Sequence, residues 1–530
     1  MSMRVGELNI MFDGITNLLQ KANMRNPNKT PSHLPATVLC DFYKISHRAQ
    51  YPDKTQLVYS TWTPRASRIN GATEVVAFGF QAFIQNYLVD FFEDNFFGRP
   101  RADVVAEYKR VIQFTLGDPN PDTSHIEDLW NLQYLPLKIK AVDEGTLVPI
   151  RVPMLTIQNT DPRFFWLTNY IESLASCELW QSSTSATIAN KYRKLLDKYA
   201  NETGSADFVM FQGHDFSMRG MSSLQSAMSS GAGHLLSFVG TDTIPAILYL
   251  EKFYGADIAK ELVGTSIPAT EHSVMCSYGS TAQEELEAYR RIITKVYPSG
   301  FVSIVSDTID LWQVTDVVLP ALKADIMARK GGPVGDRVVI RPDSGDPVLI
   351  VTGDPSAPVG SSAYKGVVET LWDIFGGTVN SKGYKELDPH IGCIYGDAIT
   401  IDRATQICEK LKAKKFASTN CVYGIGSYTY QYNTRDTFGF ALKSTAVVID
   451  GVEKAIFKNP KTDDGTKKSQ KGAVSLYLEG GKLKCKDQQT LLAVNSLSED
   501  EDQLKTIFLD GKLTRPQTLA QVRAKLASSK

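Results

Sequence analysis

The sequence VVIRPDSGDP (residues 338–347) joins a short β-branched run to charged residues and a turn. An apolar strand that stops abruptly at polar residues is typical of strands whose carboxyl ends carry an active site. Arg341 offers a planar fork for a phosphate, carboxylate or amide oxygen, and Asp343 can accept a hydrogen bond or face Mg²⁺. An Arg–Asp pair that only ties down the loop is an equally good interpretation of these residues alone.

Six further segments repeat this plan. The apolar runs are residues 207–211, 235–239, 266–269, 301–305, 393–395 and 421–423. Segments with helical periodicity lie between most of them, at residues 244–254, 281–296, 311–328, 363–375 and 403–414. Alternating strands and helices predict a parallel sheet, closed or open. Polar residues after almost every run favour a β/α barrel, because an open sheet concentrates its site near one switch point.

The residues that end these runs are candidates for function. They are His214, Asp215, Phe216, Asp242, Glu271, His272, Asp307, Gly396, Asp397, Gly426 and Ser427. Glycines at strand ends expose backbone N–H groups that can bind phosphate, and Arg435 and Lys443 follow shortly after them. Ordinary roles compete with these, since Asp242 or Asp307 can cap a helix and a lone histidine is more often structural. Their repetition around one rim favours an enzyme.

Size and charge limit the remaining possibilities. A chain of 530 residues predicts two domains, and 57 basic against 58 acidic residues give no reason to expect nucleic-acid or anionic-membrane binding. No run approaches the roughly 20 apolar residues needed to span a bilayer. Seven cysteines without CxxC spacing, together with an N-terminus that lacks a signal-peptide pattern, predict a cytoplasmic protein. P-loop, zincin and nucleophile-elbow motifs are absent from the sequence.

We expect four segments along the chain. Residues 1–35 form an N-terminal extension, 36–206 an α+β domain, 207–470 the barrel, and 471–530 a segment that packs back on the N-terminal domain. The lysine-rich stretch 458–471 is by itself typical of a solvated surface loop.

Ordered motifs resemble those of the nicotinamide phosphoribosyltransferases, a family of type II phosphoribosyltransferases. They are HDFSMRG (214–220), GTDT (240–243), IPATEHS (267–273), VSD (305–307), IRPDSGDP (340–347), YGD (395–397) and TRD (434–436), with DFYK (41–44) upstream. The resemblance covers roughly residues 36–515. It implies an irregular, TIM-like β/α barrel beside an α+β domain, and a head-to-tail homodimer with active sites at the interface.

The resemblance also implies an activity: transfer of phosphoribosyl from phosphoribosyl pyrophosphate to nicotinamide in NAD salvage. Phe216 and Tyr43 of the partner subunit would stack on the nicotinamide ring, and Asp242 would accept from its carboxamide. The other implied substrate contacts are Arg219, Ser266, Ser303, Arg341 and Asp343 near the ring and ribose, Asp307 at the ribose hydroxyls, Gly396, Asp397, Gly426, Ser427 and Arg435 at the 5′-phosphate, and Arg65, Lys443, Lys458 and Lys471 at the pyrophosphate or ATP phosphates. The implied catalytic set is His272, Asp307, Arg341 and Asp343.

Two small partners are implied in addition. Mg²⁺ would assist pyrophosphate departure, with its direct ligands unassigned, and ATP would activate the enzyme by phosphorylating His272. An aspartate at 242 suits an amide and repels the carboxylate of nicotinate. A nicotinate or quinolinate phosphoribosyltransferase, a non-catalytic binding protein on the same fold and a metal-dependent barrel lyase are the alternatives. The sequence departs from the family in two places. The family's glycine-rich run after the phosphate strand reads GIGSY here (residues 424–428), and Ala441 stands where the family can carry a serine.

Overall fold

The computed structural model describes residues 34–462 and 468–529. The described chain forms two compact units, one comprising the residues up to Asp41 with Asp90–Tyr134 and the other Phe42–Val89 with Leu135 onward. All residues predicted to act in the site belong to the larger unit. The predicted N-terminal extension lies outside the described residues except for its last two, and the predicted boundaries at 206 and 470 stay a prediction.

The smaller unit is helical. Its main helices are α4 (Arg101–Leu116) and α5 (Ser124–Leu132). α4 ends at Gly117, whose φ of 71° is the left-handed conformation common after a helix. The rings of Tyr108 and His125 meet edge to face with centroids 5.6 Å apart, which joins the two helices.

A six-stranded parallel sheet forms one part of the larger unit. Its strands lie in the order β7 (Gly240–Thr241), β6 (Gly213–Asp215), β13 (Cys421–Ile425), β12 (Ile391–Tyr395), β9 (Arg337–Arg341) and β8 (Phe301–Val305). All neighbours pair in parallel, so the carboxyl ends of all six strands lie along one edge. Residues 265–269 make an isolated bridge at each margin, from Thr265 to Gly240 and from Ala269 to Ser303.

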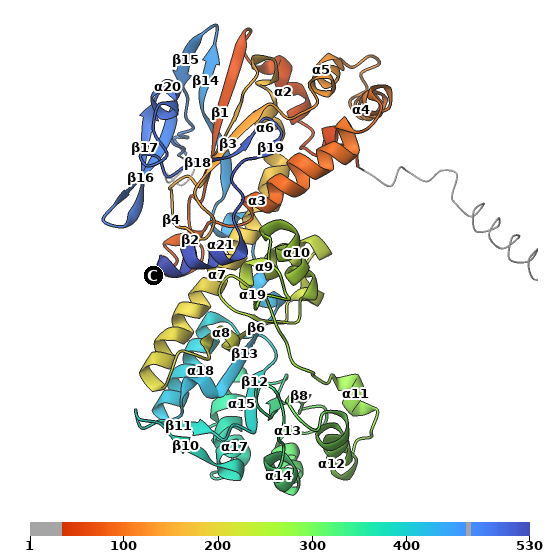
Figure 1. Cartoon of the computed structure of the whole chain (residues 1–530), viewed down its shortest axis with the longest axis vertical. Coiled ribbons are helices and arrows are strands. Elements are labelled where there is room, and N and C mark those ends of the chain that lie inside the picture. The colour runs from red at the N-terminus through yellow and green to blue at the C-terminus, as the bar shows by residue number, and fades with distance from the viewer. Residues whose placement is uncertain (1–33, 463–467, 530) are drawn as a thin grey trace, which may run out of the picture. The chain divides into compact units, whose positions relative to one another are not determined.

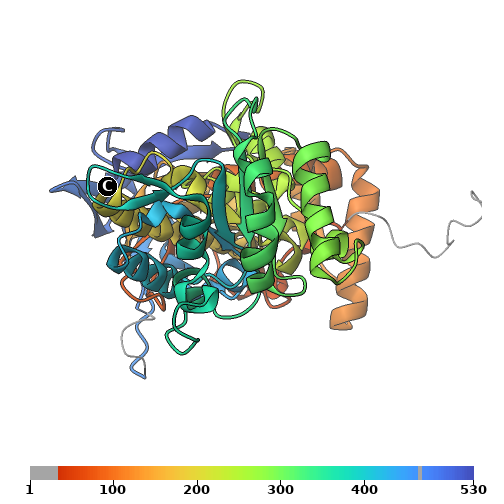
Figure 2. The same ribbon diagram turned by 90° about the horizontal axis from the view of Figure 1, so that it is seen from below.

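Helices cover this sheet. They include α10 (Ile244–Tyr254), α12 (Ala282–Arg291), α14 (Leu319–Met327), α17 (Val367–Phe375) and α18 (Ile401–Ala413), as the periodicity predicts. α12 and α14 stand side by side in both views (Figure 1, Figure 2). α12 begins at Thr281 in a capping box with Glu284, which satisfies backbone donors of the first turn. Alternate strand residues such as Val302 and Ile304 pack into a buried core with α12, α14, α17 and α18, whereas α10 contributes to a second core.

Four of the seven predicted strands are confirmed and three are wrong. The runs at 301–305, 338–340, 393–395 and 421–423 are strands, whereas 207–211 runs into helix α8 (Val209–Gln212), 235–239 is a turn before β7, and 266–269 is limited to the isolated bridges. Short apolar runs are buried in helices and turns as readily as in strands, so periodicity does not separate them. The proposed cap role of Asp242 is also wrong, since Thr243 occupies the N-cap of α10.

A seven-stranded antiparallel sheet forms the other part. Its order is β15 (Val452–Ala455), β14 (Ala441–Ile449), β1 (Thr55–Thr63), β5 (Leu155–Asn159), β3 (Leu137–Ala141), β18 (Lys505–Leu509) and β19 (Lys512–Leu513). Residues after 471 add β16 (Ala473–Glu479), β17 (Lys482–Gln489) and α21 (Leu519–Ser528). No helix of the described chain is long and apolar enough to cross a membrane.

Candidate active site

A cleft of about 760 Å³ opens at the carboxyl ends of the parallel strands. Ten of the predicted site residues line it: Phe216, Arg219, Asp242, His272, Arg341, Asp343, Gly396, Asp397, Gly426 and Ser427. They come from the ends of β6, β7, β9, β12 and β13 and from the loop before His272. Because the parallel strands end at one edge of the sheet, residues more than 200 positions apart in the sequence lie in one site.

An aromatic ring and a carboxylate lie together in this cleft. Phe216 follows β6, and its backbone N–H donates to the carbonyl of Ile425 at 3.0 Å. Its ring lies against Gly424, where a Cβ would come within 2.7 Å of Phe216 Cδ2. The His214 ring lies on another side with centroids 4.6 Å apart. Phe216 is thus fixed in place, with its ring available to a flat ligand.

Asp242 is held by two donors. His214 Nε2 lies 2.8 Å from Asp242 Oδ1, and the Ser266 hydroxyl donates to the same oxygen at 2.6 Å. Burial raises the pKa of the Asp242 carboxyl, but these hydrogen bonds and the charges of His214 and Arg341 outweigh burial and set it below its ordinary value. Asp242 is therefore an ionised acceptor at neutral pH.

Two acids and a histidine meet after strands β8 and β9. The Asp343 backbone N–H and the Ser344 hydroxyl donate to Asp307 Oδ2 at 2.8 and 2.6 Å. His272 Nε2 lies 3.9 Å from Asp307 Oδ1 and 3.7 Å from Asp343 Oδ2, while its Nδ1 is 3.2 Å from the hydroxyl of Thr308. This arrangement concentrates negative charge next to a nitrogen that can carry a proton or a phosphoryl group.

Three buried polar atoms near the cleft have no hydrogen-bond partner in the described chain. They are Ser303 Oγ, Asp307 Oδ1 and Arg341 Nε. The Arg341 guanidinium still donates through its other end, to the carbonyl of Thr270. Unsatisfied buried polar atoms are uncommon in folded proteins and are reasonable at a site that receives a polar ligand.

Strand-end glycines line the cleft for two different reasons. A Cβ at Gly396 would lie 2.3 Å from Asp343 Oδ1, so this position needs a glycine for close packing. A Cβ at Gly426 would meet no described atom within 4 Å, so its backbone faces open space. Ser427 follows it and lies under Gly220, where a Cβ would be 2.1 Å from Ser427 Oγ. Gly426 and Ser427 both line the cleft just after β13, a position where backbone N–H groups suit an anion.

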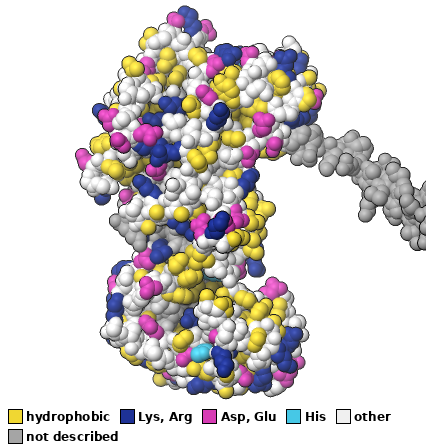
Figure 3. All heavy atoms as spheres, viewed as in Figure 1, with side chains coloured by type: hydrophobic (Ala, Val, Ile, Leu, Met, Phe, Trp, Pro, Cys, Tyr) yellow, Lys and Arg dark blue, Asp and Glu magenta, His cyan; other side chains and the backbone are white. Residues whose placement is uncertain are grey.

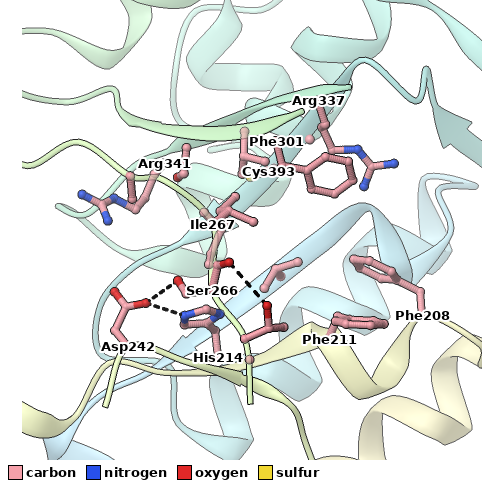
Figure 4. A pocket seen from close by; sticks show the side chains of 18 of the residues that line it. Phe208, Phe211, His214, Asp242, Ser266, Ile267, Phe301, Arg337, Arg341 and Cys393 are labelled. Atoms are coloured by element: carbon pink, nitrogen blue, oxygen red, sulfur yellow. Dashed lines mark hydrogen bonds and ion pairs between the residues drawn. The ribbon is translucent and has the colours of Figure 1, made fainter. Parts of the chain in front are cut away.

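A narrower cavity of about 130 Å³ continues from the cleft into the sheet (Figure 4). It shares Phe216, Asp242 and Arg341 with the cleft and contains the predicted residues Ser266 and Ser303. Phe208, Phe211, Phe301 and Arg337 also line it, and the sequence did not single these out. Most of its lining is apolar, which suits a flat organic ring rather than a phosphate.

Tyr43 and Lys443 line a separate cavity of about 430 Å³ in the larger unit. Glu172 joins two lysines there, with its Oε2 paired to Lys44 and its Oε1 3.3 Å from Lys443 Nζ. Burial lowers the pKa of the Lys443 ammonium, and Glu172 offsets part of that effect. Tyr43 is 57% exposed, with His47 and Lys44 near its ring.

Four predicted cationic residues are not among the linings of these three cavities: Arg65, Arg435, Lys458 and Lys471. Arg65 Nε donates to the carbonyl of Gly439 at 2.8 Å, and Arg435 NH2 lies 3.8 Å from the Asp436 carboxylate. The Lys471 ammonium lies over the ring of Phe457 at 5.1 Å. Their assignment to phosphate groups stays a prediction.

The cleft also contains residues that the sequence analysis did not single out: Met218, Met221, Ser223, Leu224 and Ala227. Glu271 lines the cleft as well, as expected for a strand-end candidate directly before His272. The others belong to the loop after Phe216 and the start of α9 (Leu224–His234), where no residue type marks a site.

Comparisons with known proteins agree with this geometry. The family described as nicotinate phosphoribosyltransferase matches residues 211–511, and the nicotinamide phosphoribosyltransferase N-terminal domain matches residues 36–96. The nicotinamide phosphoribosyltransferase of Acinetobacter baylyi is 49% identical over 494 residues, which covers 92% of this chain and 96% of that protein. Those of Mycoplasma pneumoniae and Xanthomonas campestris pv. campestris are 37% and 32% identical, covering 83% and 91% of this chain and 95% and 96% of theirs.

Two solved structures share the fold. A nicotinate-nucleotide pyrophosphorylase from Pyrococcus furiosus superposes with a TM-score of 0.55 at 14% identity, covering 95% of this chain and 97% of that one. Human nicotinic acid phosphoribosyltransferase gives 0.54 at 15% identity, covering 93% of both. The fold is thus a mixed α/β one with a parallel sheet of this type, and the chain belongs to the nicotinate phosphoribosyltransferase family, among its nicotinamide phosphoribosyltransferases.

Proposed function

We propose that this protein is a pentosyltransferase that transfers phosphoribosyl from phosphoribosyl pyrophosphate to nicotinamide, giving nicotinamide mononucleotide and pyrophosphate. One observation carries this proposal. A single cleft combines an aromatic ring beside an ionised acceptor, Phe216 and Asp242, with Asp343 and Gly426. Asp307 lies directly behind this lining, where its Oδ2 accepts from the Asp343 backbone N–H. These are the groups that a flat amide, a ribose and a phosphate require.

The base is selected by charge and hydrogen bonding. Nicotinamide would stack on Phe216, and its carboxamide NH₂ would donate to Asp242. Nicotinate has a carboxylate instead, which cannot donate and would face the negative charge of Asp242 in a partly desolvated site. The site therefore favours the amide over the acid.

The transfer of the phosphoribosyl group requires little proton transfer by side chains. When pyrophosphate leaves C1 of the ribose, positive charge develops on the ring, as it does in glycoside hydrolysis. Asp307 and Asp343 would stabilise that charge and hold the ribose hydroxyls. Arg341 would orient the substrates, so that the nicotinamide nitrogen approaches C1 from the face opposite the leaving group.

The acid pair fits Mg²⁺. Asp307 Oδ1 is a buried carboxylate oxygen without a hydrogen-bond partner in the described chain, and Asp343 is a second oxygen donor nearby. No cluster of three or more side chains suited to a metal occurs among the described residues. Mg²⁺ is commonly held by one or two carboxylates together with substrate phosphates and water. Bound there, the ion would neutralise the departing pyrophosphate.

ATP coupling through His272 is part of the proposal. Nε2 of His272 faces Asp307 and Asp343, and Thr308 lies at its other nitrogen. A phosphoryl group on Nε2 would add negative charge beside two acids. It would therefore favour Mg²⁺ binding at this place, and with it the binding of phosphoribosyl pyrophosphate.

We further propose a head-to-tail homodimer in which Tyr43 of the partner subunit covers the face of the nicotinamide opposite Phe216. The exposed ring of Tyr43 and the basic cavity around Lys443 support this arrangement. Exposed hydrophobic side chains also gather over α10, among them Ile244 and Leu248 (Figure 3). Mixed dimers of a Tyr43→Ala and an Asp242→Ala subunit would regain one complete site, while each parent would stay impaired.

The bridges made by residues 265–269 support a sheet that closes into an irregular barrel. The same segment pairs with Gly240 of β7 and Ser303 of β8, the two strands at the margins of the sheet. Closure would place Ser266 and His272 on the seam. The buried thiols of Cys393, Cys408 and Cys421 form no disulfide, which supports a cytoplasmic location.

Pyrophosphate release tests the proposed reaction. We expect the purified protein to release pyrophosphate from phosphoribosyl pyrophosphate and Mg²⁺ with nicotinamide and not with nicotinate. Preference for nicotinate would favour the nicotinate enzyme, and no release with either base would favour a binding protein.

A further inference from the structure

The carboxylate of Asp242 is occupied on one side only. His214 Nε2 and Ser266 Oγ both bond to Oδ1, at 2.8 and 2.6 Å (Figure 4). No donor of the described chain bonds to Oδ2, which is turned away from both partners (Figure 4). One oxygen thus anchors the side chain, and the other is left for a ligand.

The position of His214 is fixed by its strand. β6 and β7 pair in parallel with His214 opposite Gly240, and the Asp242 backbone N–H donates to the carbonyl of Asp215 at 2.9 Å. A Cβ at Gly240 would lie 2.7 Å from His214 Nδ1, so the imidazole lies directly against the backbone of β7. With Phe216 beside it, the ring has little freedom to turn.

A second histidine supports the same strand from behind. His234 Nε2 lies 2.9 Å from the carbonyl of Gly240, and its Nδ1 lies 2.7 Å from the Tyr430 hydroxyl. Burial lowers the pKa of His234 to about 4, so the ring is neutral and donates through Nε2 while Nδ1 accepts. β7 is therefore held at the residue against which His214 packs.

We propose that His214 is a positioning residue that determines base specificity, by anchoring Asp242 through Oδ1 so that only Oδ2 is presented to the base. This inference rests on the proposed function and adds a residue to its specificity. A carboxylate held in this way can accept from the carboxamide NH₂ in one geometry only.

Loss of the His214 donor would relax the choice of base rather than only slow the reaction. Burial favours the protonated form of Asp242, and the hydrogen bond from His214 opposes it. Without that bond, Asp242 can turn, and a protonated fraction can donate to the carboxylate of nicotinate. The affinity for nicotinamide should therefore fall, and the affinity for nicotinate should rise.

Two substitutions of His214, by glutamine and by asparagine, introduce the same amide group at different distances from the backbone. Comparing them distinguishes loss of the hydrogen bond to Asp242 from loss of the imidazole ring itself. The amide of His214→Gln reaches the place of Nε2 and can still donate to Asp242, whereas the shorter His214→Asn cannot. His390→Gln is the matched control, because His390 forms a similar pair with Asp388 at 2.7 Å outside the cleft.

We expect the ratio of kcat/KM for nicotinamide to that for nicotinate to fall roughly 10- to 100-fold in His214→Asn. Most of the change should appear in the KM for nicotinamide, with the KM for phosphoribosyl pyrophosphate unchanged. His214→Gln should stay within a few-fold of the unaltered protein, and His390→Gln should not differ from it. Calorimetric titration with each base gives the same comparison without turnover.

An unchanged ratio in His214→Asn would overturn the inference and leave the proposed function intact. So would equal losses in the Asn and Gln variants. If His214→Asn does not fold, Ser266→Ala tests the same oxygen from an exposed position, and an unchanged ratio there would also count against the anchoring. Failure of the unaltered protein to bind or convert nicotinamide would instead overturn the proposed function.

Discussion

The backbone N–H of Asp343 donates to Asp307 Oδ2 at 2.8 Å, so the loop after β9 is tied to the acid that follows β8. Asparagine at 307 would keep an acceptor for this N–H but remove the negative charge. We expect Asp307→Asn to lower kcat by roughly 100-fold or more, because it removes charge stabilisation in the transition state. The melting temperature should change little.

Ser344→Ala is the control for this pair. It removes only the hydroxyl that donates to Asp307 Oδ2 at 2.6 Å. A loss below about 10-fold is expected, because this hydrogen bond is exposed to solvent and should contribute only about 1 kcal/mol. A large fall in melting temperature in Asp307→Asn would indicate that the residue maintains the loop instead of acting on substrate.

Asp242→Asn should reduce the preference for nicotinamide. Asparagine removes the charge that repels nicotinate, and its amide can donate to a carboxylate. We expect the ratio of kcat/KM for the two bases to fall by on the order of 100-fold. Steady-state kinetics with both bases measures it, and an unchanged ratio would remove Asp242 from base selection.

Gly424 and Gly426 should respond differently to alanine. A Cβ at 424 would lie 2.7 Å from the ring of Phe216, whereas a Cβ at 426 meets open space. Gly424→Ala is therefore expected to disturb folding or the nicotinamide site. Gly426→Ala should fold normally and raise the KM for phosphoribosyl pyrophosphate. Thermal melting and kinetics on both variants make the comparison, and a normal KM in Gly426→Ala would argue against phosphate binding there.

Glu285 predicts a dependence of stability on pH. Burial, with a smaller effect of Asp310, raises the pKa of this carboxyl from 4.5 to about 7, and neither oxygen has a hydrogen-bond partner in the described chain. Between these values the folded protein holds a proton that the unfolded chain has lost. The free energy of unfolding therefore falls as the pH rises through this window, by at most about 3 kcal/mol.

Glu285→Gln should remove this dependence. We expect it to raise the melting temperature at pH 8 and to leave it nearly unchanged at pH 4, where both forms of residue 285 are neutral. The same increase at both pH values would show that the effect comes from packing and not from ionisation.

His272→Ala tests ATP coupling. The basal reaction without ATP should persist, whereas stimulation by ATP should disappear, because the nitrogen facing Asp307 and Asp343 is lost. Phosphate bound covalently to the protein, measured with labelled ATP, should disappear with it. Unchanged stimulation in His272→Ala would rule out a phosphohistidine at this position.

The sequence predicts the parts of the fold that depend on local pattern. β8 and β9 are β-branched runs that end in turns, and Asp307 and Arg341 belong to the site because they follow those strands. The cleft could be assembled in outline because parallel strands end at one edge. The capping box at Thr281 is likewise a local signal.

The parts that depend on distant pairing could not be predicted. The bond between His214 and Asp242 depends on the register of β6 against β7, and that register is visible only in three dimensions. The stretch 207–211 was misread because a buried helix turn and a buried strand have the same composition. No local pattern indicates that Tyr43 and Lys443 share a cavity.

The pairing of β1 with β14 has a consequence for biosynthesis. Thr55 lies opposite Ile449 in this ladder, so a strand made early by the ribosome cannot complete one of its edges until most of the chain has emerged. Contacts between such distant residues slow folding, and an open strand edge can pair with other chains in the meantime. Newly made protein should therefore depend on chaperones, and truncations before β14 should aggregate even though the residues of the catalytic cleft have already been synthesised.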